Sequence, residues 1–207
     1  MKRLLLVIGF ITSTGFLALS QNIEITPIVG YQFGGQMNFY EGQFKGDGNL
    51  NYGLTVDIPL RDIVSLELYW SEMQTSYQWD SYDYGLATFE YDVNVHYFQV
   101  GSCKQDYLGS SDKVMGFGSL TMGAAWFDVQ DEEIADVWRF AMTLGGGLKI
   151  FFSDRVGIRL QGRMLLPMYF GGSTYYVGMG GSGVSVSSYG CLVQGDFTGG
   201  LIIMVGK

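Results

Sequence analysis

The feature that most constrains the fold is a pair of long segments, residues 138–150 and 156–168, in which polar and apolar side chains alternate. Most even-numbered positions in both segments are apolar, and most odd-numbered positions are small or polar. A period of two residues is typical of a β-strand, and Ser153, Asp154 and Arg155 suit the turn of a hairpin. Each segment is about twice as long as an ordinary strand and could cross a bilayer as a tilted strand. The sequence therefore predicts a membrane-spanning hairpin.

Six further segments show the same alternation, at residues 23–33, 49–58, 64–71, 89–97, 119–126 and 193–205. The connections between successive segments are alternately shorter and longer, and the long ones are residues 34–48, 74–88, 128–137 and 170–190. Short turns at one end and long loops at the other are typical of outer-membrane barrels. We therefore predict an all-β chain that forms an eight-stranded antiparallel up-and-down transmembrane β-barrel.

The first 20 residues have the features of a secretory signal peptide. Lys2 and Arg3 precede an apolar run, and small residues precede Gln21. The run is too short for a good membrane-spanning helix, although an uncleaved N-terminal anchor is the alternative. We expect a cleaved signal peptide at residues 1–20 and a barrel domain at residues 21–207.

Alternation alone does not show which face of the barrel is the inner one, because a soluble ligand-carrying barrel such as a lipocalin also alternates. A soluble exterior should be rich in Lys and Glu. The polar face here consists instead of Gly, Ser, Thr, Asn and Gln with a few charges, which suits the crowded interior of a small barrel. Aromatic residues near the ends of the segments resemble an interfacial girdle: Tyr31, Trp70, Phe89, Trp126 and Trp138. Both observations favour the membrane barrel.

The charge and cysteine content narrow the function further. With 20 acidic and 12 basic residues, the chain is not expected to bind nucleic acid. Cys103 and Cys191 are the only cysteines, and they fall at opposite ends of the predicted barrel. We expect no disulfide between them, although an exported protein reaches a compartment that permits one.

Three runs, EITPIVGYQFGG at residues 24–35, LGGGLKIFF at 144–152 and VGIR at 156–159, resemble the outer-membrane β-barrel domain family, the small eight-stranded porin-like and opacity-type proteins. The resemblance covers nearly the whole mature chain. It implies an outer-membrane lipid environment in a Gram-negative bacterium, and we expect a monomer. Barrels of this family usually end in an aromatic residue, whereas this chain ends Met204-Val205-Gly206-Lys207.

Ionisable residues on the predicted inner face suggest what fills the barrel. An eight-stranded barrel has room only for side chains, and buried charges of opposite sign pair with one another. We therefore expect a side-chain plug; the alternative is a narrow channel, with the acids as a cation path and the bases as an anion filter. The predicted interior charge network consists of Glu24, Asp57, Glu67, Asp92, His96, Arg139, Lys149, Arg159, Arg163 and Asp196.

Two sequence features have side chains that could form a catalytic or a metal site. His96, the only histidine, could be the general base of a lipid-modifying enzyme, but the sequence indicates no nucleophile and carboxylate converging on it. An acidic run could bind calcium, but it lacks the spacing of a calcium-binding loop; it comprises Asp128, Asp131, Glu132, Glu133 and Asp136. We expect a non-enzymatic protein without cofactor or metal.

The long loops carry aromatic residues suited to recognition, although these could equally cover the mouth of the barrel. They are Tyr77, Trp79, Tyr82, Tyr84, Tyr175, Tyr176 and Tyr189. The sequence thus favours a structural role or the binding of a surface ligand or protein through these loops.

Overall fold

The computed structural model describes residues 22–38, 42–81, 89–109, 113–130, 136–178 and 181–206, and it describes their side chains except at 36–44, 79–90 and 169–191. The predicted signal peptide lies outside the described residues. Among the described residues, no helix is long and apolar enough to span a membrane.

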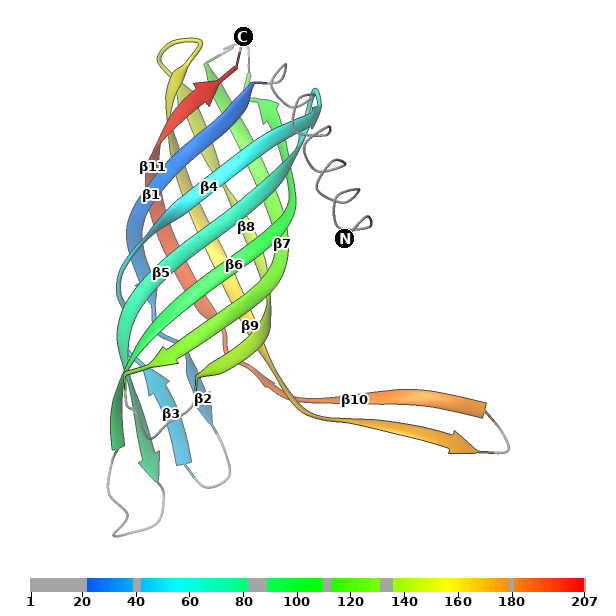
Figure 1. Ribbon diagram of the computed structural model, residues 1–207. Coiled ribbons are helices and arrows are strands. Elements are labelled where there is room, and N and C mark those ends of the chain that lie inside the picture. The colour runs from blue at the N-terminus through cyan, green and yellow to red at the C-terminus, as the bar shows by residue number, and fades with distance from the viewer. Residues whose placement is uncertain are drawn as a thin grey trace, which may run out of the picture.

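Eight long strands form the wall of the barrel (Figure 1). They are β1 (Ile23–Phe33), β4 (Asn49–Arg61), β5 (Val64–Ser81), β6 (Phe89–Tyr107), β7 (Val114–Val129), β8 (Val137–Phe151), β9 (Val156–Gly178) and β11 (Gln194–Val205). Each is paired antiparallel with its two neighbours, and pairing of β1 with β11 closes the barrel. The prediction of an eight-stranded antiparallel barrel is confirmed.

Three further strands lie at the long-loop end. The short β2 (Gln36–Asn38) and β3 (Gly42–Gly46) form a hairpin whose second strand pairs with β5, and β10 (Gly181–Cys191) pairs with the far half of β9. Figure 1 shows the β9–β10 hairpin extending away from the barrel. Much of what the sequence suggested as loop is therefore paired strand, because a hairpin that continues past the barrel wall satisfies its backbone hydrogen bonds.

The two faces of the wall differ as a membrane barrel requires. Outward-facing side chains include many exposed apolar residues, among them Phe197, Leu50 and Val29. Inward-facing positions carry buried Thr, Ser, Gln and charged residues, separated by glycines. At Gly147, a Cβ atom would lie 1.9 Å from the Leu160 carbonyl oxygen, so the close approach of β8 and β9 there excludes every side chain.

The interior has two regions stacked along the barrel axis. The half nearer the short turns holds charged residues, and the half nearer the long loops holds a cluster of buried apolar and aromatic side chains. The cluster consists of Ile28, Tyr69, Met73, Tyr77, Val93, Val95, Tyr97, Ala125, Ala141, Leu165 and Leu192.

The side chains of β6 point in the opposite direction from the one that the sequence predicts. Val93, Val95 and Tyr97 are buried inside the barrel, whereas Asp92 and His96 are on the outer wall. In this part of β6 the apolar side chains point inward and the polar ones outward. The inner side packs in the apolar cluster, and the outer side lies near the long-loop end. Alternation identifies the two faces of a strand but not which of them is buried.

Candidate functional site

Lys149 on β8 is the centre of the first group of interior charges. Its ammonium nitrogen lies 2.5 Å from Glu24 Oε2, 2.9 Å from Asp57 Oδ2 and 2.7 Å from Gln105 Oε1. The three N–H donors of a lysine thus have three acceptors. These acceptors come from β1, β4 and β6, so that one fully buried side chain links four strands.

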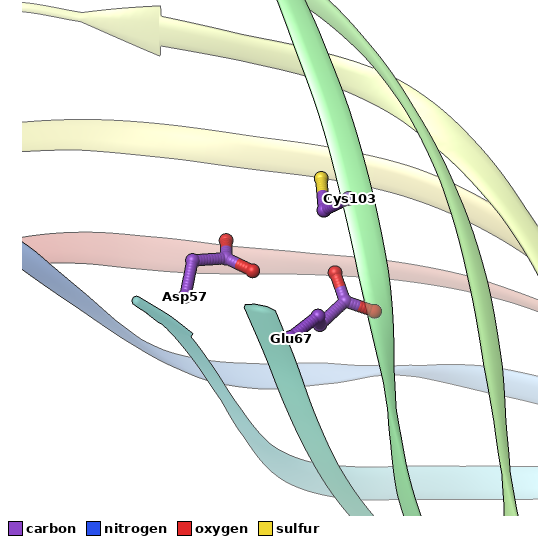
Figure 2. Close-up of side chains that lie close together, drawn as sticks. All are labelled: Asp57, Glu67 and Cys103. Carbon is purple, nitrogen blue, oxygen red and sulfur yellow. The ribbon is translucent and has the colours of Figure 1, made fainter. Parts of the chain in front are cut away.

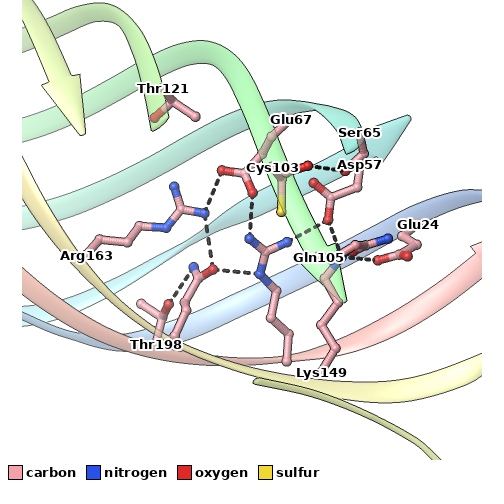
Figure 3. Close-up of polar contacts among 12 residues, drawn as sticks. Glu24, Asp57, Ser65, Glu67, Cys103, Gln105, Thr121, Lys149, Arg163 and Thr198 are labelled. Atoms are coloured by element: carbon pink, nitrogen blue, oxygen red, sulfur yellow. Dashed lines mark hydrogen bonds and ion pairs between the residues drawn. The ribbon is translucent and has the colours of Figure 1, made fainter. Parts of the chain in front are cut away.

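Arg159 on β9 continues the network along the axis (Figure 3). It donates from Nη1 to Asp57 Oδ2 at 2.7 Å and from Nη2 to Glu67 Oε2 at 2.6 Å. Its Nε donates to Gln161 Oε1 at 2.6 Å, and its guanidinium lies 4.2 Å from the centre of the Phe117 ring. Asp57 is therefore shared by Lys149 and Arg159, which makes the two groups one network.

Arg163 and Asp196 lie above this network, toward the long loops. Arg163 Nη2 donates to Glu67 Oε1 at 3.1 Å, and the guanidinium lies 3.9 Å from the centre of the Tyr69 ring. Asp196 Oδ2 accepts hydrogen bonds from the Tyr69 hydroxyl and from Asn51 Nδ2, each at 3.4 Å. Asp196 and Arg163 are paired across β11 and β9, but Arg163 directs its hydrogen bond to Glu67.

A chain of neutral polar groups leads from Asp196 into the apolar cluster. Gln32 donates to Gln194 Oε1 at 3.3 Å, and the Tyr97 hydroxyl donates to the same oxygen at 2.5 Å. Gln194 in turn donates to the Tyr77 hydroxyl oxygen at 3.2 Å. The sequence predicts that Tyr77 takes part in loop recognition, but the structure buries it inside the barrel.

Asp57, Glu67 and Cys103 bring three potential metal ligands within 4.8 Å of one another (Figure 2). Both carboxylates already form ion pairs, Asp57 with Lys149 and Arg159, and Glu67 with Arg159 and Arg163. A metal ion would add its charge next to the three buried cations that already neutralise these carboxylates. The residues therefore fit an ion-pair network rather than a metal centre. Cys103 is a free, buried thiol.

The structure brings together six of the ten predicted interior charges in one ion-paired network: Glu24, Asp57, Glu67, Lys149, Arg159 and Arg163. Asp196 is buried beside them. Arg139 is half-buried toward the long-loop end of β8, where it donates to the Trp138 carbonyl oxygen. Asp92 and His96 were wrongly placed in the interior, because they are on the outer wall.

Sequence reasoning missed the neutral members of the interior. Gln32, Asn51, Tyr69 and Gln194 are all buried and bonded. Their inward position follows from the same alternation that located the charges, but the hydrogen bonds that join them depend on the tertiary structure. Of the predicted loop aromatics, Tyr82 and Tyr84 lie outside the described residues, and the side chains of Trp79, Tyr175, Tyr176 and Tyr189 lie outside the described side chains.

His96 belongs to a row of outward side chains that crosses five adjacent strands, each residue paired with the next. This interfacial row consists of Tyr52, Glu72, His96, Trp126 and Trp138. His96 Nδ1 lies 3.7 Å from Glu72 Oε2, and its ring stacks on Trp126 with 4.9 Å between centroids. Trp126 stacks on Trp138 at 5.3 Å and donates from Nε1 to Asp136 at 3.2 Å.

On β6, the composition of the outer wall changes at this row. On β6, Phe98 and Val100 are exposed below it, toward the short turns, and Asn94 and Asp92 follow above it. Aromatic residues with a polar atom favour the boundary between lipid and water. The interfacial row therefore has the composition of a membrane-interface girdle, and on β6 it lies where exposed apolar residues give way to polar ones.

Comparison with solved structures agrees with this architecture, although no family model and no curated protein matches the sequence. The chain is similar to Neisserial surface protein A from Neisseria, with 9% identity over 87% of this chain and 96% of that one and a TM-score of 0.52. It is also similar to the N-terminal β-barrel domain of OprF from Pseudomonas aeruginosa, with 12% identity, coverages of 88% and 98% and a TM-score of 0.44. The chain has the fold of the small outer-membrane barrels.

A third similar structure is Ail, the attachment invasion locus protein of Yersinia pestis. It shares 12% identity over 89% of this chain and 99% of that one, with a TM-score of 0.43. At these identities the likeness concerns the fold, and function must be argued from the residues of this chain.

Proposed function

We propose that this protein is a non-enzymatic integral outer-membrane barrel whose interior is closed by its own side chains and whose role is structural or surface-binding, exerted at the long-loop end. The observation that carries the proposal is the interior ion-pair network. Arg159 and Lys149 reach carboxylates on the far side of the barrel. Such cross-links occupy the axis that a solute would have to follow.

The apolar cluster supports the same conclusion from the other half of the interior. Tyr97, Met73 and Leu165 are fully buried there. A solute or ion that passed the charged half would next meet side chains that cannot replace its hydration. The long-loop end, where strands continue beyond the interfacial row, is the part left for contact with partners.

Two experiments test this proposal. Purified protein in planar lipid bilayers should show no stable single-channel conductance, and discrete openings in the unmodified protein would contradict the plug. Protease added to whole cells should cut within residues 74–88 or 170–190 and spare residues 59–63. The reverse pattern would place the long loops on the periplasmic side.

A narrow channel is the second candidate, and a specific observation favours it. Within the described part of the chain, buried polar atoms without a hydrogen-bond partner include Arg163 Nε and Nη1, Asp196 Oδ1 and Gln99 Nε2. Buried polar groups of this kind commonly bind water. At the short-turn end, a depression of about 740 Å³ reaches Glu24 and Gln105, which contact Lys149. The conductance measurement decides between plug and channel.

A lipid-modifying enzyme is the third candidate, since His96 lies on the outer wall beside Glu72. The residues adjacent to His96 on that face carry neither hydroxyl nor thiol: they are Asn94 and Phe98 on β6, Glu72 on β5 and Trp126 on β7. A nucleophile is thus missing from the neighbourhood of this histidine. Lipids extracted from cells that express His96→Ala or the unmodified protein should have the same composition.

A further inference from the structure

A polar depression of about 600 Å³ lies at the long-loop end of β4 to β7, adjoining the interfacial row. It forms where the chain leaves β3 and enters β4 through Asp47 and Gly48. Asp47 remains attached to β5, since its N–H donates to the Ser76 carbonyl at 3.1 Å and its carbonyl accepts from Thr75 Oγ1 at 2.5 Å. We call this feature the rim depression; its polar lining is Asp47, Asn49, Gln74, Thr75, Ser76, Asp92, Asn94 and Gln130.

The rim depression is a built surface, because several of its side chains are held in place. Asn49 Nδ2 donates to the Gln74 carbonyl at 2.8 Å, and Ser76 Oγ donates to Asp92 Oδ1 at 2.8 Å. The N–H of Gln130 donates to the Asp92 carbonyl at 2.9 Å. Among the residues that the structure describes, no hydrogen bond engages the side-chain amides of Gln74 and Asn94. These amides are available to a ligand.

The chemistry of the lining selects the class of ligand. The ten described lining residues include no lysine or arginine and two aspartates, which disfavours phosphate, sulfate and carboxylate groups. A side-chain amide both donates and accepts, and a carboxylate accepts. A neutral molecule with several adjacent hydroxyl groups can satisfy both at once. Such a molecule is an uncharged sugar.

The location of the rim depression indicates that the sugar is attached to a lipid. Asn94 is two residues from His96 on the same face of β6, so the depression begins one residue pair above the interfacial row. Below the row, the same wall presents Phe98, Val100 and Met122 to the lipid. The sugar headgroup of a glycolipid would lie in the depression, and the acyl chains of the same lipid would lie along these residues.

We propose that the rim depression binds the uncharged sugar headgroup of a glycolipid in the membrane that the barrel spans. The proposal rests on the proposed surface-binding role and adds a site and a ligand class to it. The amides of Asn94 and Gln74 and the carboxylates of Asp92 and Asp47 bond the sugar hydroxyls. The interfacial row sets the depth at which the headgroup lies.

The test uses the full mature protein in phosphatidylcholine nanodiscs that contain equal mole fractions of digalactosyldiacylglycerol and phosphatidylglycerol. Lipids that stay bound to the protein are counted by native mass spectrometry. We expect the galactolipid to be retained in preference to phosphatidylglycerol. We also expect Asn94→Leu to weaken its binding about tenfold, as the loss of roughly one net hydrogen bond predicts.

Ser102→Leu is the matched control, since it places the same side chain on the outer face of the same strand at the short-turn end. It should leave galactolipid binding unchanged. Equal retention of the two lipids, or equal binding by Asn94→Leu and the unmodified protein, would overturn the proposal. Free digalactose that binds as tightly as the lipid would overturn the membrane source. Conductance is measured separately, so a channel would refute the plug without affecting this result.

Discussion

Arg159 and Glu67 face each other across the full width of the barrel, with 2.6 Å between Nη2 and Oε2 and both side chains completely buried. Their strands, β9 and β5, are each four places from the other in the eight-strand order. A buried ion pair that spans the interior stabilises the barrel little compared with a well-packed apolar core. Removal of one partner, however, leaves the buried network of three acids and three bases with one uncompensated charge.

The first prediction therefore concerns the coupling between these two residues. Arg159→Ala and Glu67→Ala should each lower the free energy of unfolding by about 3–5 kcal/mol. The double variant should lose less than the sum, because removing one acid and one base together restores the charge balance of the buried network. Urea-induced unfolding of protein refolded into lipid vesicles measures all three values.

Asp92→Ala is the matched control for this cycle, because Asp92 is exposed on the outer wall and makes no ion pair with Arg159 in the described residues. The loss of unfolding free energy caused by Asp92→Ala should add to the loss caused by Arg159→Ala. Strict additivity of Arg159→Ala and Glu67→Ala would show that the cross-barrel pair does not form.

The second prediction is that the two halves of the interior block conduction in series. Arg159→Ala opens the charged half but leaves Tyr97, Met73 and Leu165 in place, and Tyr97→Ala does the reverse. Either variant alone should show no conductance in planar bilayers, whereas the double variant should conduct ions. A conducting Arg159→Ala protein would mean that the apolar cluster does not seal the barrel.

The sequence predicts the number and order of the barrel strands, and for seven of the eight it predicts which side chains point inward. Alternation with a period of two marks a strand whose two faces meet different surroundings. The direction of the β6 side chains could not be predicted in this way. Val93, Val95 and Tyr97 alternate with polar residues as regularly as lipid-facing residues do, but they face the apolar cluster inside the barrel. Only the register of pairing with β5 and β7 resolves this ambiguity.

The interior charge network could be predicted from the sequence only in part. Lys149 and Arg159 could be assigned to the interior from their strands, but their choice of Glu24, Asp57 and Glu67 depends on strand tilt and on side-chain length. The rim depression could not be predicted, since it depends on how β3 and β4 meet the edge of β5. That junction is a tertiary feature without a local sequence signature.

The third prediction places the interfacial row at the lipid–water boundary. In a protein whose other tryptophans are replaced by Phe, the fluorescence of Trp138 should be quenched most by lipids brominated close to the headgroup. Trp70 lies outward on β5, one residue pair nearer the short turns than Glu72 of the row, so a protein that keeps only Trp70 should be quenched more by deeper bromines. If the order of quenching depths were reversed, the row would not mark the membrane surface.

The last prediction uses Cys103 as a reporter of the interior. Its side chain is completely buried between Asp57 and Glu67, in the charged half of the barrel. In the Cys191→Ser background, we expect a small methanethiosulfonate reagent to modify Cys103 only as fast as the barrel unfolds, because a closed interior admits no reagent. Ser153→Cys, in the exposed turn between β8 and β9, provides the control for a freely reactive thiol in the Cys103→Ser, Cys191→Ser background. Mass spectrometry of samples quenched at intervals gives both rates. Modification of Cys103 faster than unfolding would show that the charged half is open to solvent, and would favour the narrow channel over the plug.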